Sequence, residues 1–324
     1  MSEELVPSTP APVDLPPDAR RNFALVIPAY NEVPVIPELV RELKEAFRHH
    51  QLEGEILLVD DGSTDGTGEL ARQLAADWDS LRVLTHRTNL GKTEAMVTAA
   101  RATDREILVI FDADLQHSPH EIPRFLALMA EGWDIVCGRK VGPYDKRMVS
   151  SVYNRLSRRL FNVPVSDLNS MKAFRASILR ETPLRHDWHR FFVVLAMDRG
   201  YSATELDIAL HPRRAGVSKY SGLWRVVVGV MDLISVWFLL VFSKKPLLLF
   251  GTAGSGLAGA GVIVGLVALY LRLVHGMGFR PLLTLVLLLV TVGVTLVGFG
   301  LLAEMVAQLR QEVEALRRRE EEEG

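Results

Sequence analysis

Between residues 22 and 138 the chain alternates short apolar runs with longer segments whose apolar residues recur every three or four positions. Runs of the first kind are typical of buried strands, and segments of the second kind are typical of helices packed on a sheet. The alternation predicts an α/β domain with a Rossmann-like, mainly parallel sheet covered by helices. We expect strands at Phe23–Ile27, Glu55–Val59, Leu81–Thr85, Ile107–Phe111 and Asp134–Cys137, and helices at Val35–Phe47, Thr67–Asp77, Thr93–Ala102 and Pro119–Ala130.

Two later stretches are apolar throughout. Pro246–Leu271 and Pro281–Ala303 contain no charged residue, and each exceeds the ~20 residues that cross a bilayer core. We therefore expect two transmembrane helices, joined by the short loop Arg272–Arg280. Gly261 and Gly265 have the spacing that allows close helix contact. Packing of the hairpin is the expected use of this spacing, and a homo-oligomer is the second use open to it.

Basic residues flank the two apolar stretches unequally. The positive-inside rule places both termini in the cytoplasm, because the loop between the stretches carries fewer cations than the flanks. The expected location is the inner (plasma) membrane of the cell, as a multi-pass protein whose α/β domain is cytoplasmic. The flanking cations are Arg213, Arg214, Lys219, Arg225, Lys244 and Lys245 before the first stretch, and Arg310 and Arg317–Arg319 after the second.

The segment Leu223–Phe242 has two interpretations. It is apolar enough for a third span, but Arg225 and Asp232 would each cost roughly 2.5–3.5 kcal/mol at a bilayer centre. Interfacial amphipathic helices suit it better, with Trp224 and Trp237 at headgroup depth and the lipid bilayer as partner. The predicted organisation is a disordered leader (1–21), the α/β domain (22–220), interfacial helices (221–245), the two transmembrane helices (246–306, about 246–271 and 281–303) and a charged, solvated helical tail (307–324).

Composition narrows the function classes. The 37 basic residues nearly balance the 39 acidic ones, so we expect no nucleic-acid partner. The single cysteine, Cys137, excludes an internal disulfide and any multi-thiolate zinc site, and its apolar neighbours predict a buried strand residue.

Polar motifs follow the first two expected strands. The first strand runs into Pro28-Ala29-Tyr30-Asn31-Glu32, and the second into Asp60-Asp61-Gly62-Ser63-Thr64-Asp65-Gly66-Thr67. Carboxylates, hydroxyls and glycines at a strand-to-helix turn can bind a base, a ribose or a phosphate. Each motif alone is equally consistent with ordinary turn and N-cap chemistry.

The fourth expected strand ends in Asp112-Ala113-Asp114-Leu115-Gln116-His117. Two carboxylates one residue apart, with no basic residue adjacent in the sequence, repel each other unless they share a cation or retain a proton. We expect Mg²⁺ or Mn²⁺ on Asp112 and Asp114, with Gln116 as a third ligand, near a nucleotide diphosphate. His117 is expected to lie near a phosphate or at a helix N-terminus.

The run Asn89-Leu90-Gly91-Lys92-Thr93 ends like a P-loop but is not one, because His86 stands where the motif requires glycine. Lys92, at the start of an expected helix, either meets an anionic group or is solvated.

In this order, PAYNE, VDDGSTDGT, NLGK and DADLQHSP resemble the family 2 inverting glycosyltransferases of the GT-A fold. More narrowly, they resemble the polyprenyl-phosphate glycosyltransferases, which include the dolichol-phosphate mannose synthases. The resemblance runs from about residue 22 to 306 and includes the basic segment His211–Tyr220. It implies transfer of one sugar from a GDP- or UDP-sugar donor to a polyprenyl phosphate acceptor, undecaprenyl or dolichyl. The QxxRW motif of processive synthases is absent, which argues against a polymerising enzyme.

The resemblance also implies roles for individual residues. Asp114, Asp167 and Arg139 would act at the reacting centre, and Asp112, Asp114 and Gln116 would hold the metal. The chain departs from the family's glycine-aromatic-arginine run at Ser170–Arg175, which leaves the role of Lys172 open. The remaining donor- and acceptor-binding residues would be Pro28, Ala29, Tyr30, Glu32, Asp60, Asp61, Lys92, Ala113, Arg213, Arg214 and Lys219, with Arg147 as a looser match.

The chemistry of such an acceptor needs no strong general base. A phosphate monoester, with its second pKa near ~6, is mostly dianionic at pH 7. Basic residues would neutralise it and direct its oxygen. Two alternatives stay open: a family 2 transferase with another lipid or saccharide acceptor, and a non-catalytic scaffold or lipid-carrier transporter.

Overall fold

The structure is a computed structural model that describes residues 13–141, 164–168, 170–181, 184, 188–211, 231, 235–236, 238, 245–276, 278 and 280–323. The chain divides into two compact units, Met1–Arg225 and Val226–Gly324. We call them the sheet unit and the hairpin unit and describe each by itself.

The sheet unit is built on one sheet whose strand order is β3-β2-β1-β4-β6-β5-β7. Neighbouring strands are parallel except at β6, which runs antiparallel to β4 and β5. The five strands expected from the sequence are confirmed, with ends that differ by up to four residues, whereas β6 and β7 were not predicted. The strands are β1 (Phe23–Ala29), β2 (Glu55–Asp60), β3 (Leu81–Thr85), β4 (Ile107–Ile110), β5 (Ile135–Val141), β6 (Lys172–Arg175) and β7 (Ala203–Ala209).

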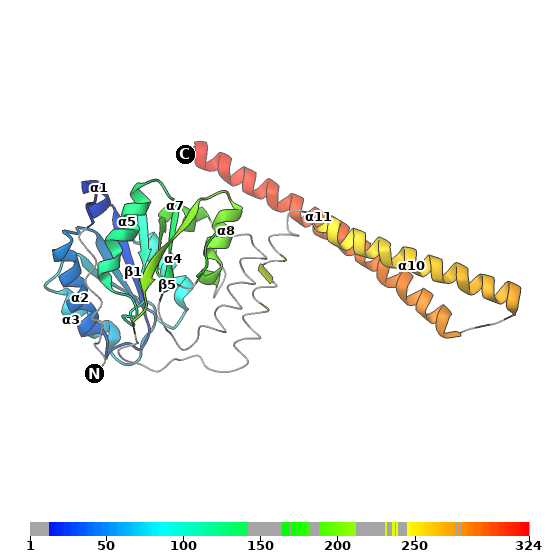
Figure 1. Cartoon of the computed structure of the whole chain (residues 1–324), viewed down its shortest axis with the longest axis horizontal. Helices are drawn as coiled ribbons and strands as arrows, with labels where there is room; N and C mark the ends of the chain where they lie inside the picture. Colours follow the sequence, from blue (N-terminus) through cyan, green and yellow to red (C-terminus); the bar gives the residue numbers. More distant parts are fainter. Residues whose placement is uncertain are drawn as a thin grey trace. The chain divides into compact units, whose positions relative to one another are not determined.

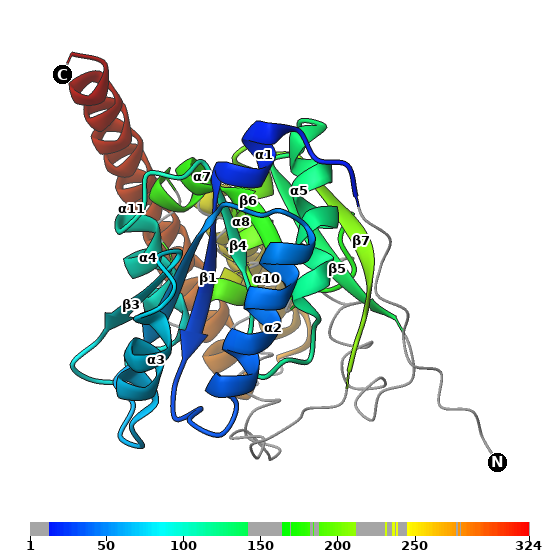
Figure 2. The ribbon, with the colours of Figure 1, turned by 90° about the vertical axis from the view of Figure 1, so that its left-hand side faces the viewer.

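Helices cover both faces of this sheet (Figure 2). Phe23, Leu25 and Ile27 of β1 belong to the buried cluster shared with α2, α3 and α5. On the other face lie α4, α7 and α8, where Phe174 packs on Phe192 with ring centroids 4.4 Å apart. The helices are α2 (Ile36–His49), α3 (Thr67–Ala75), α4 (Lys92–Arg101), α5 (Ile122–Ala130), α7 (Ala176–Glu181) and α8 (Phe192–Asp198), with the short 3-10 helices η1 (Pro119–Glu121) and η2 (Trp188–Arg190).

The expected disordered leader is wrong for residues 13–21. This segment contains the helix α1 (Pro17–Arg21), and Leu15 and Ala19 are buried. Arg20 ties it down, because its Nε donates to the Leu15 carbonyl at 3.1 Å and its own carbonyl accepts from the Glu53 N–H at 2.8 Å. The apolar residues of this segment are too few to show a helical period. Residues 1–12 lie outside the described part of the chain.

The order of the strands places the polar motifs together. β1 pairs with β2 on one side and with β4 on the other. The order in which the chain adds strands to the sheet therefore reverses direction at β1. A sheet of this kind binds ligands outside the carboxyl ends of the strands at such a reversal. The motifs after β1, β2 and β4 all lie at this edge.

The hairpin unit contains α10 (Pro246–His275) and α11 (Arg280–Glu323), which lie side by side (Figure 1). Both are long and apolar enough to cross a membrane. They exceed the expected spans, so residues 272–275 and Arg280 of the expected loop belong to helices instead. The tail is helical to Glu323, as expected. The choice between interfacial helices and a third span over 221–245 falls almost entirely outside the described residues.

Glycine sets the contact between the two helices. A Cβ added to Gly293 would lie 2.6 Å from both the Ala258 nitrogen and the Gly254 carbonyl oxygen. A Cβ on Gly261 would meet Val290 at 2.8 Å, so Gly261 faces the partner helix as its spacing predicts. The helices therefore approach more closely than side chains allow.

Candidate active site

The turns after β1 and β2 are joined by hydrogen bonds. The Asn31 N–H donates to the Ser63 hydroxyl at 3.0 Å, and the Asn31 side-chain oxygen accepts from the Thr64 N–H at 2.9 Å. The Glu32 N–H donates to the Thr67 hydroxyl at 2.9 Å. Asn31 has φ of +53°, a left-handed conformation that asparagine tolerates better than most residues. PAYNE and DDGSTDGT thus form one structure, in which Pro28, Tyr30 and Glu32 are half-buried.

Asp61 organises the loop that carries Lys92. Its carboxylate accepts from the N–H groups of Leu90 and Gly91, both at 2.8 Å, and lies 2.7 Å from His86 Nδ1. The carboxylate of Asp60 instead accepts from the Ser63 N–H at 3.1 Å. Both aspartates are buried. The structure gives Asp61 a role in shaping the loop, and its role in a nucleoside pocket stays a prediction.

The loop after β4 presents the expected metal-binding residues on one side. Asp112, Asp114 and Gln116 are half-buried, whereas the intervening Ala113 and Leu115 are buried. Asp114 Oδ1 accepts from the Gln116 N–H at 3.2 Å. Leu115 has φ of +52°, a conformation that a bulky residue adopts only when its surroundings enforce it. The loop is therefore held in one shape that groups its polar side chains.

Asp112 has a basic partner that is distant in the sequence. Lys92 Nζ forms an ion pair with Asp112 Oδ1 across the edge of the sheet. Burial by itself would raise the pKa of Asp112, but the charge and hydrogen bond of Lys92 outweigh it and lower the pKa to about 2. Of the two alternatives for Lys92, contact with an anionic group is the one observed, and this group is the protein's own carboxylate.

The cation that β5 presents to these carboxylates is Lys140. Its Nζ lies 3.6 Å from Asp167 Oδ2, and its charge also acts on Asp112 and His117. We expected Arg139 in this place. Consecutive residues of a strand point to opposite faces, so the two neighbours cannot share one site.

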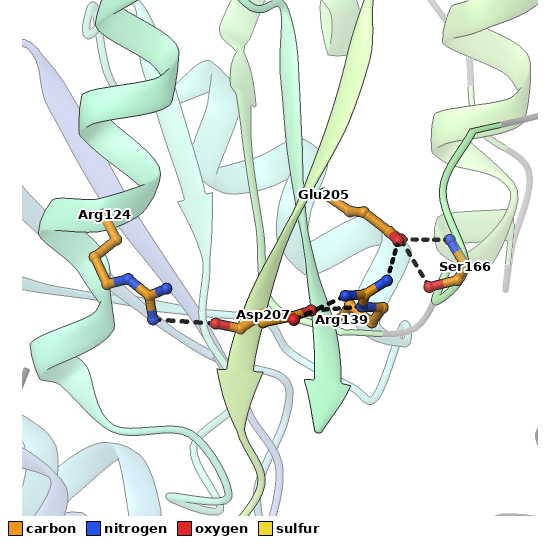
Figure 3. Close-up of polar contacts among 5 residues, drawn as sticks. All are labelled: Arg124, Arg139, Ser166, Glu205 and Asp207. Carbon is orange, nitrogen blue, oxygen red and sulfur yellow. Dashed lines mark hydrogen bonds and ion pairs between the residues drawn. The ribbon is translucent and has the colours of Figure 1, made fainter. Parts of the chain in front are cut away.

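Arg139 instead pairs with β7 (Figure 3). Its Nη2 donates to Asp207 Oδ2 at 2.7 Å, and its Nη1 donates to Glu205 Oε1 at 3.2 Å. No described contact joins Arg139 to Asp112 or Asp114. No local sequence signal separates the two cations, because Ile135 to Gly138 are all buried and give no alternation of buried and exposed residues.

Lys172 on β6 and its register partner Cys137 on β5 are both buried. The Lys172 side chain on β6 donates from Nζ to the Leu168 carbonyl at 2.8 Å. Burial lowers the pKa of Lys172, and the charge of Lys92 adds to the effect. Cys137 is fully buried, as expected, and burial raises the pKa of its thiol to about 12. A thiolate nucleophile at neutral pH is therefore excluded.

The end of β7 approaches the aspartate loop. The His211 N–H donates to the Gln116 backbone carbonyl at 2.9 Å, and His117 Nδ1 lies 3.3 Å from the Ala209 carbonyl. The basic segment that begins at His211 therefore starts beside the aspartate loop. Arg147, Arg213, Arg214 and Lys219 lie outside the described residues.

The donor set fits a divalent cation that is shared with a substrate. Among the described residues, no group of three His, Cys, Asp or Glu side chains could enclose a metal ion by itself. Mg²⁺ is commonly bound by one or two carboxylates together with substrate phosphates, and keeps several waters. Asp112 and Asp114 match that arrangement.

Comparison with known proteins identifies the family. Residues 24–191 match the model of glycosyl transferase family 2. The dodecaprenyl-phosphate galacturonate synthase of Rhizobium johnstonii is 32% identical over 300 residues, covering 88% of each chain. The undecaprenyl-phosphate 4-deoxy-4-formamido-L-arabinose transferase of Shewanella sediminis is 30% identical over 305 residues, covering 90% of this chain and 89% of its own. The chain belongs to glycosyl transferase family 2, and the expected enzyme class is confirmed.

Solved structures confirm the GT-A fold. The glucosyl-3-phosphoglycerate synthase of Mycobacterium tuberculosis, crystallised with Mn²⁺, UDP and glucosyl-3-phosphoglycerate, superposes with a TM-score of 0.55. It is 19% identical and covers 69% of this chain and 81% of its own. Another crystal structure of that enzyme contains Mg²⁺ and UDP.

Proposed function

We propose that this protein transfers a single sugar from a GDP- or UDP-sugar to a membrane polyprenyl phosphate, with inversion at the anomeric carbon. The observation that carries the proposal is the group of charged residues at one edge of the sheet, where Asp112 and Asp114 lie with Lys92 and Lys140. Two relatives that match most of the chain are named for transfer to or synthesis of polyprenyl-phosphate sugars. The UDP in the GT-A neighbours supports a uridine donor as the first to test.

The donor half of the site would stabilise a departing diphosphate. Asp112 and Asp114 would hold Mg²⁺ or Mn²⁺, which supplies positive charge where the leaving group becomes negative. Lys92 stands beside Asp112 and can meet a phosphate oxygen once the carboxylate has another cation. The turn from Pro28 to Glu32 would border the nucleoside. Asp61 would keep the Lys92 loop in place through its bonds to Leu90 and Gly91.

The acceptor half would bring a second anion to the sugar. Lys140 faces the aspartates and is held by Asp167, so its charge can neutralise an incoming phosphate. Arg213, Arg214 and Lys219 are the further cations expected from the sequence. Because the acceptor is already ionised, Asp167 would orient Lys140 rather than remove a proton. In-line displacement would give a β-linked product from an α-linked donor.

The hairpin unit supports a lipid as the acceptor substrate. A polyprenyl chain costs ~0.8 kcal/mol per CH₂ to withdraw from the bilayer, so the chemistry must take place at the headgroups. Two spanning helices and basic flanks would hold the sheet unit on the cytoplasmic side.

An acceptor assay tests this function. Purified protein in detergent is given Mn²⁺, undecaprenyl phosphate and radiolabelled GDP- or UDP-sugars, and the product is extracted into organic solvent. We expect label in the organic phase with one donor, and none when undecaprenol replaces its phosphate. Transfer only to another lipid or to a saccharide would contradict the proposal and support the first alternative. No turnover with any donor would favour the non-catalytic alternative.

A further inference from the structure

Glu205 on β7 holds the backbone beside Asp167. One oxygen of its carboxylate, Oε2, accepts from both the N–H and the hydroxyl of Ser166, each at 2.7 Å (Figure 3). The Glu205 side chain is 20% exposed, so water competes little for this oxygen. Two donors from one residue fix both the position and the orientation of Ser166. Because Asp167 is the next residue, these bonds also fix the position of its backbone.

Arg139 holds Glu205 in turn. Its guanidinium binds both oxygens of Asp207 and donates from Nη1 to Glu205 Oε1 at 3.2 Å, on the oxygen that Ser166 does not use. Arg139 and Asp207 are register partners of β5 and β7, so the pair is built into the sheet.

These contacts argue against a direct phosphate contact by Arg139. Three of its nitrogen atoms already donate to carboxylates. With Glu205 and Asp207 the group carries one positive and two negative charges, and a phosphate dianion would be repelled by this arrangement. Lys140, the next residue, faces the site instead.

We propose that Glu205 and Arg139 are positioning residues for the transfer reaction: Glu205 anchors Ser166 so that Asp167 stays beside Lys140, and Arg139 keeps Glu205 in that place. This inference rests on the proposed function. It assigns to Arg139 an action through Glu205 rather than on the substrate.

A double-mutant cycle tests the inference. Steady-state rates are measured for wild type, Arg139→Ala, Glu205→Ala and the double variant, with the donor and undecaprenyl phosphate varied in turn. We expect Glu205→Ala to lower kcat about tenfold, since a misplacement near 1 Å can cost up to ~10²-fold, with both KM values within about twofold. Arg139→Ala lowers kcat less. The double variant matches Glu205→Ala alone, because residues in one network are not additive.

Matched variants separate positioning from loss of fold. Glu205→Gln keeps an acceptor oxygen for Ser166 and should retain more activity than Glu205→Ala. Arg124→Ala is the control, because Arg124 donates to the Asp207 carbonyl at 3.0 Å and pairs with Glu121 without contacting Arg139 or Glu205. It should stay within about twofold of wild type. Ser166→Ala, which removes only the hydroxyl, provides a milder variant if Glu205→Ala does not fold, and should lower kcat with unchanged KM.

The outcomes distinguish the two proposals. Multiplicative losses in the double variant, or a rise in KM for donor or acceptor with kcat unchanged in Arg139→Ala, would show direct binding and overturn the inference. Full activity of Glu205→Ala, or of Ser166→Ala where that milder variant is used, would overturn it too. In each of these cases a wild-type enzyme that glycosylates polyprenyl phosphate leaves the proposed function intact. If the wild-type protein transfers sugar to no polyprenyl phosphate, the proposed function itself is contradicted.

Discussion

Segments pack closely within the sheet unit and within the hairpin unit, but by opposite means. In the sheet unit, polar side chains such as the buried Asp61 and the half-buried Glu205 hold loops together through hydrogen bonds. In the hairpin unit, contact depends on missing side chains, because Gly254 and Gly293 let two backbones meet. The contrast is the one expected if the hairpin unit spans a membrane as proposed, since a membrane offers no hydrophobic drive between apolar helices and favours tight van der Waals packing. Chemistry and anchoring should therefore be separable by mutation.

The largest expected effect is confined to the sheet unit. Asp112→Asn and Asp114→Asn should each lower kcat by about 10²–10³-fold, because each removes a carboxylate that would hold the divalent cation, and with it the positive charge that would stabilise the leaving diphosphate. Asp167→Asn should cost only about tenfold, less than the ~10²–10⁴-fold that a general base contributes. Turnover with saturating Mn²⁺ measures all three. If Asp167→Asn were the most damaging, the mechanism without a general base would be wrong.

A second change should act on the hairpin unit and spare the chemistry. Gly293→Ala places a Cβ 2.6 Å from the backbone of α10, which cannot yield, so overpacking should cost about 1–3 kcal/mol. The matched control is Gly298→Ala, five residues along the same helix, where a Cβ meets nothing within 4 Å. Thermal unfolding in detergent compares them. Equal unfolding temperatures for the two variants would show that close packing at Gly293 does not stabilise the hairpin unit.

The stability of the sheet unit should depend on pH through His50. The residue is 7% exposed, and its imidazole shares a hydrogen bond of 3.1 Å with His120. Burial, together with the charges of His120 and His49, lowers the pKa of His50 from 6.5 to about 4. The unfolded chain therefore binds more protons between these values, and the free energy of unfolding should fall as the pH drops from about 6.5 to 4.

This loss should reach about 1–2 kcal/mol by pH 5. Unfolding temperatures measured from pH 7 to pH 5 test it. His50→Gln should flatten the dependence, whereas His49→Gln, at an exposed neighbour, should keep most of it. An unchanged slope in His50→Gln would exclude His50 as the source.

The smallest effect concerns the start of α10. Glu304 on α11 accepts from the Leu247 N–H at 3.1 Å and so caps the first turn of the neighbouring helix. Glu304→Ala should lower stability by about 1 kcal/mol, while Glu304→Gln keeps an acceptor and should lose less. Thermal unfolding of the two variants should rank them in that order. Equal losses would mean that charge, not the acceptor oxygen, matters at this position, since both variants remove the charge.

How far the sequence could predict these features depended on how local each one is. The carboxyl ends of β1, β2 and β4 were predictable to within two residues, because a buried run followed by polar residues is a local pattern. The pairing of Lys92 with Asp112 was not, because it joins residues that only the order of the strands brings together. β6 escaped prediction because it holds only two apolar residues between Lys172 and Arg175, and the buried Lys172 finds its partner in the Leu168 carbonyl.

The role of Arg139 was likewise not predictable from local sequence. The family resemblance favoured it as a phosphate ligand, and only the structure separated its face of β5 from that of Lys140. The hairpin was readable from length and charge alone. Which of its glycines face the partner helix required the register between α10 and α11.

The account depends most directly on a divalent cation at Asp112 and Asp114, and manganese binding measured by electron paramagnetic resonance tests it. Wild-type protein titrated with Mn²⁺ in the presence of UDP or GDP should bind one ion per chain. Asp112→Asn and Asp114→Asn should each abolish this binding while the protein stays folded. One bound Mn²⁺ per chain in the doubly substituted protein would contradict the account.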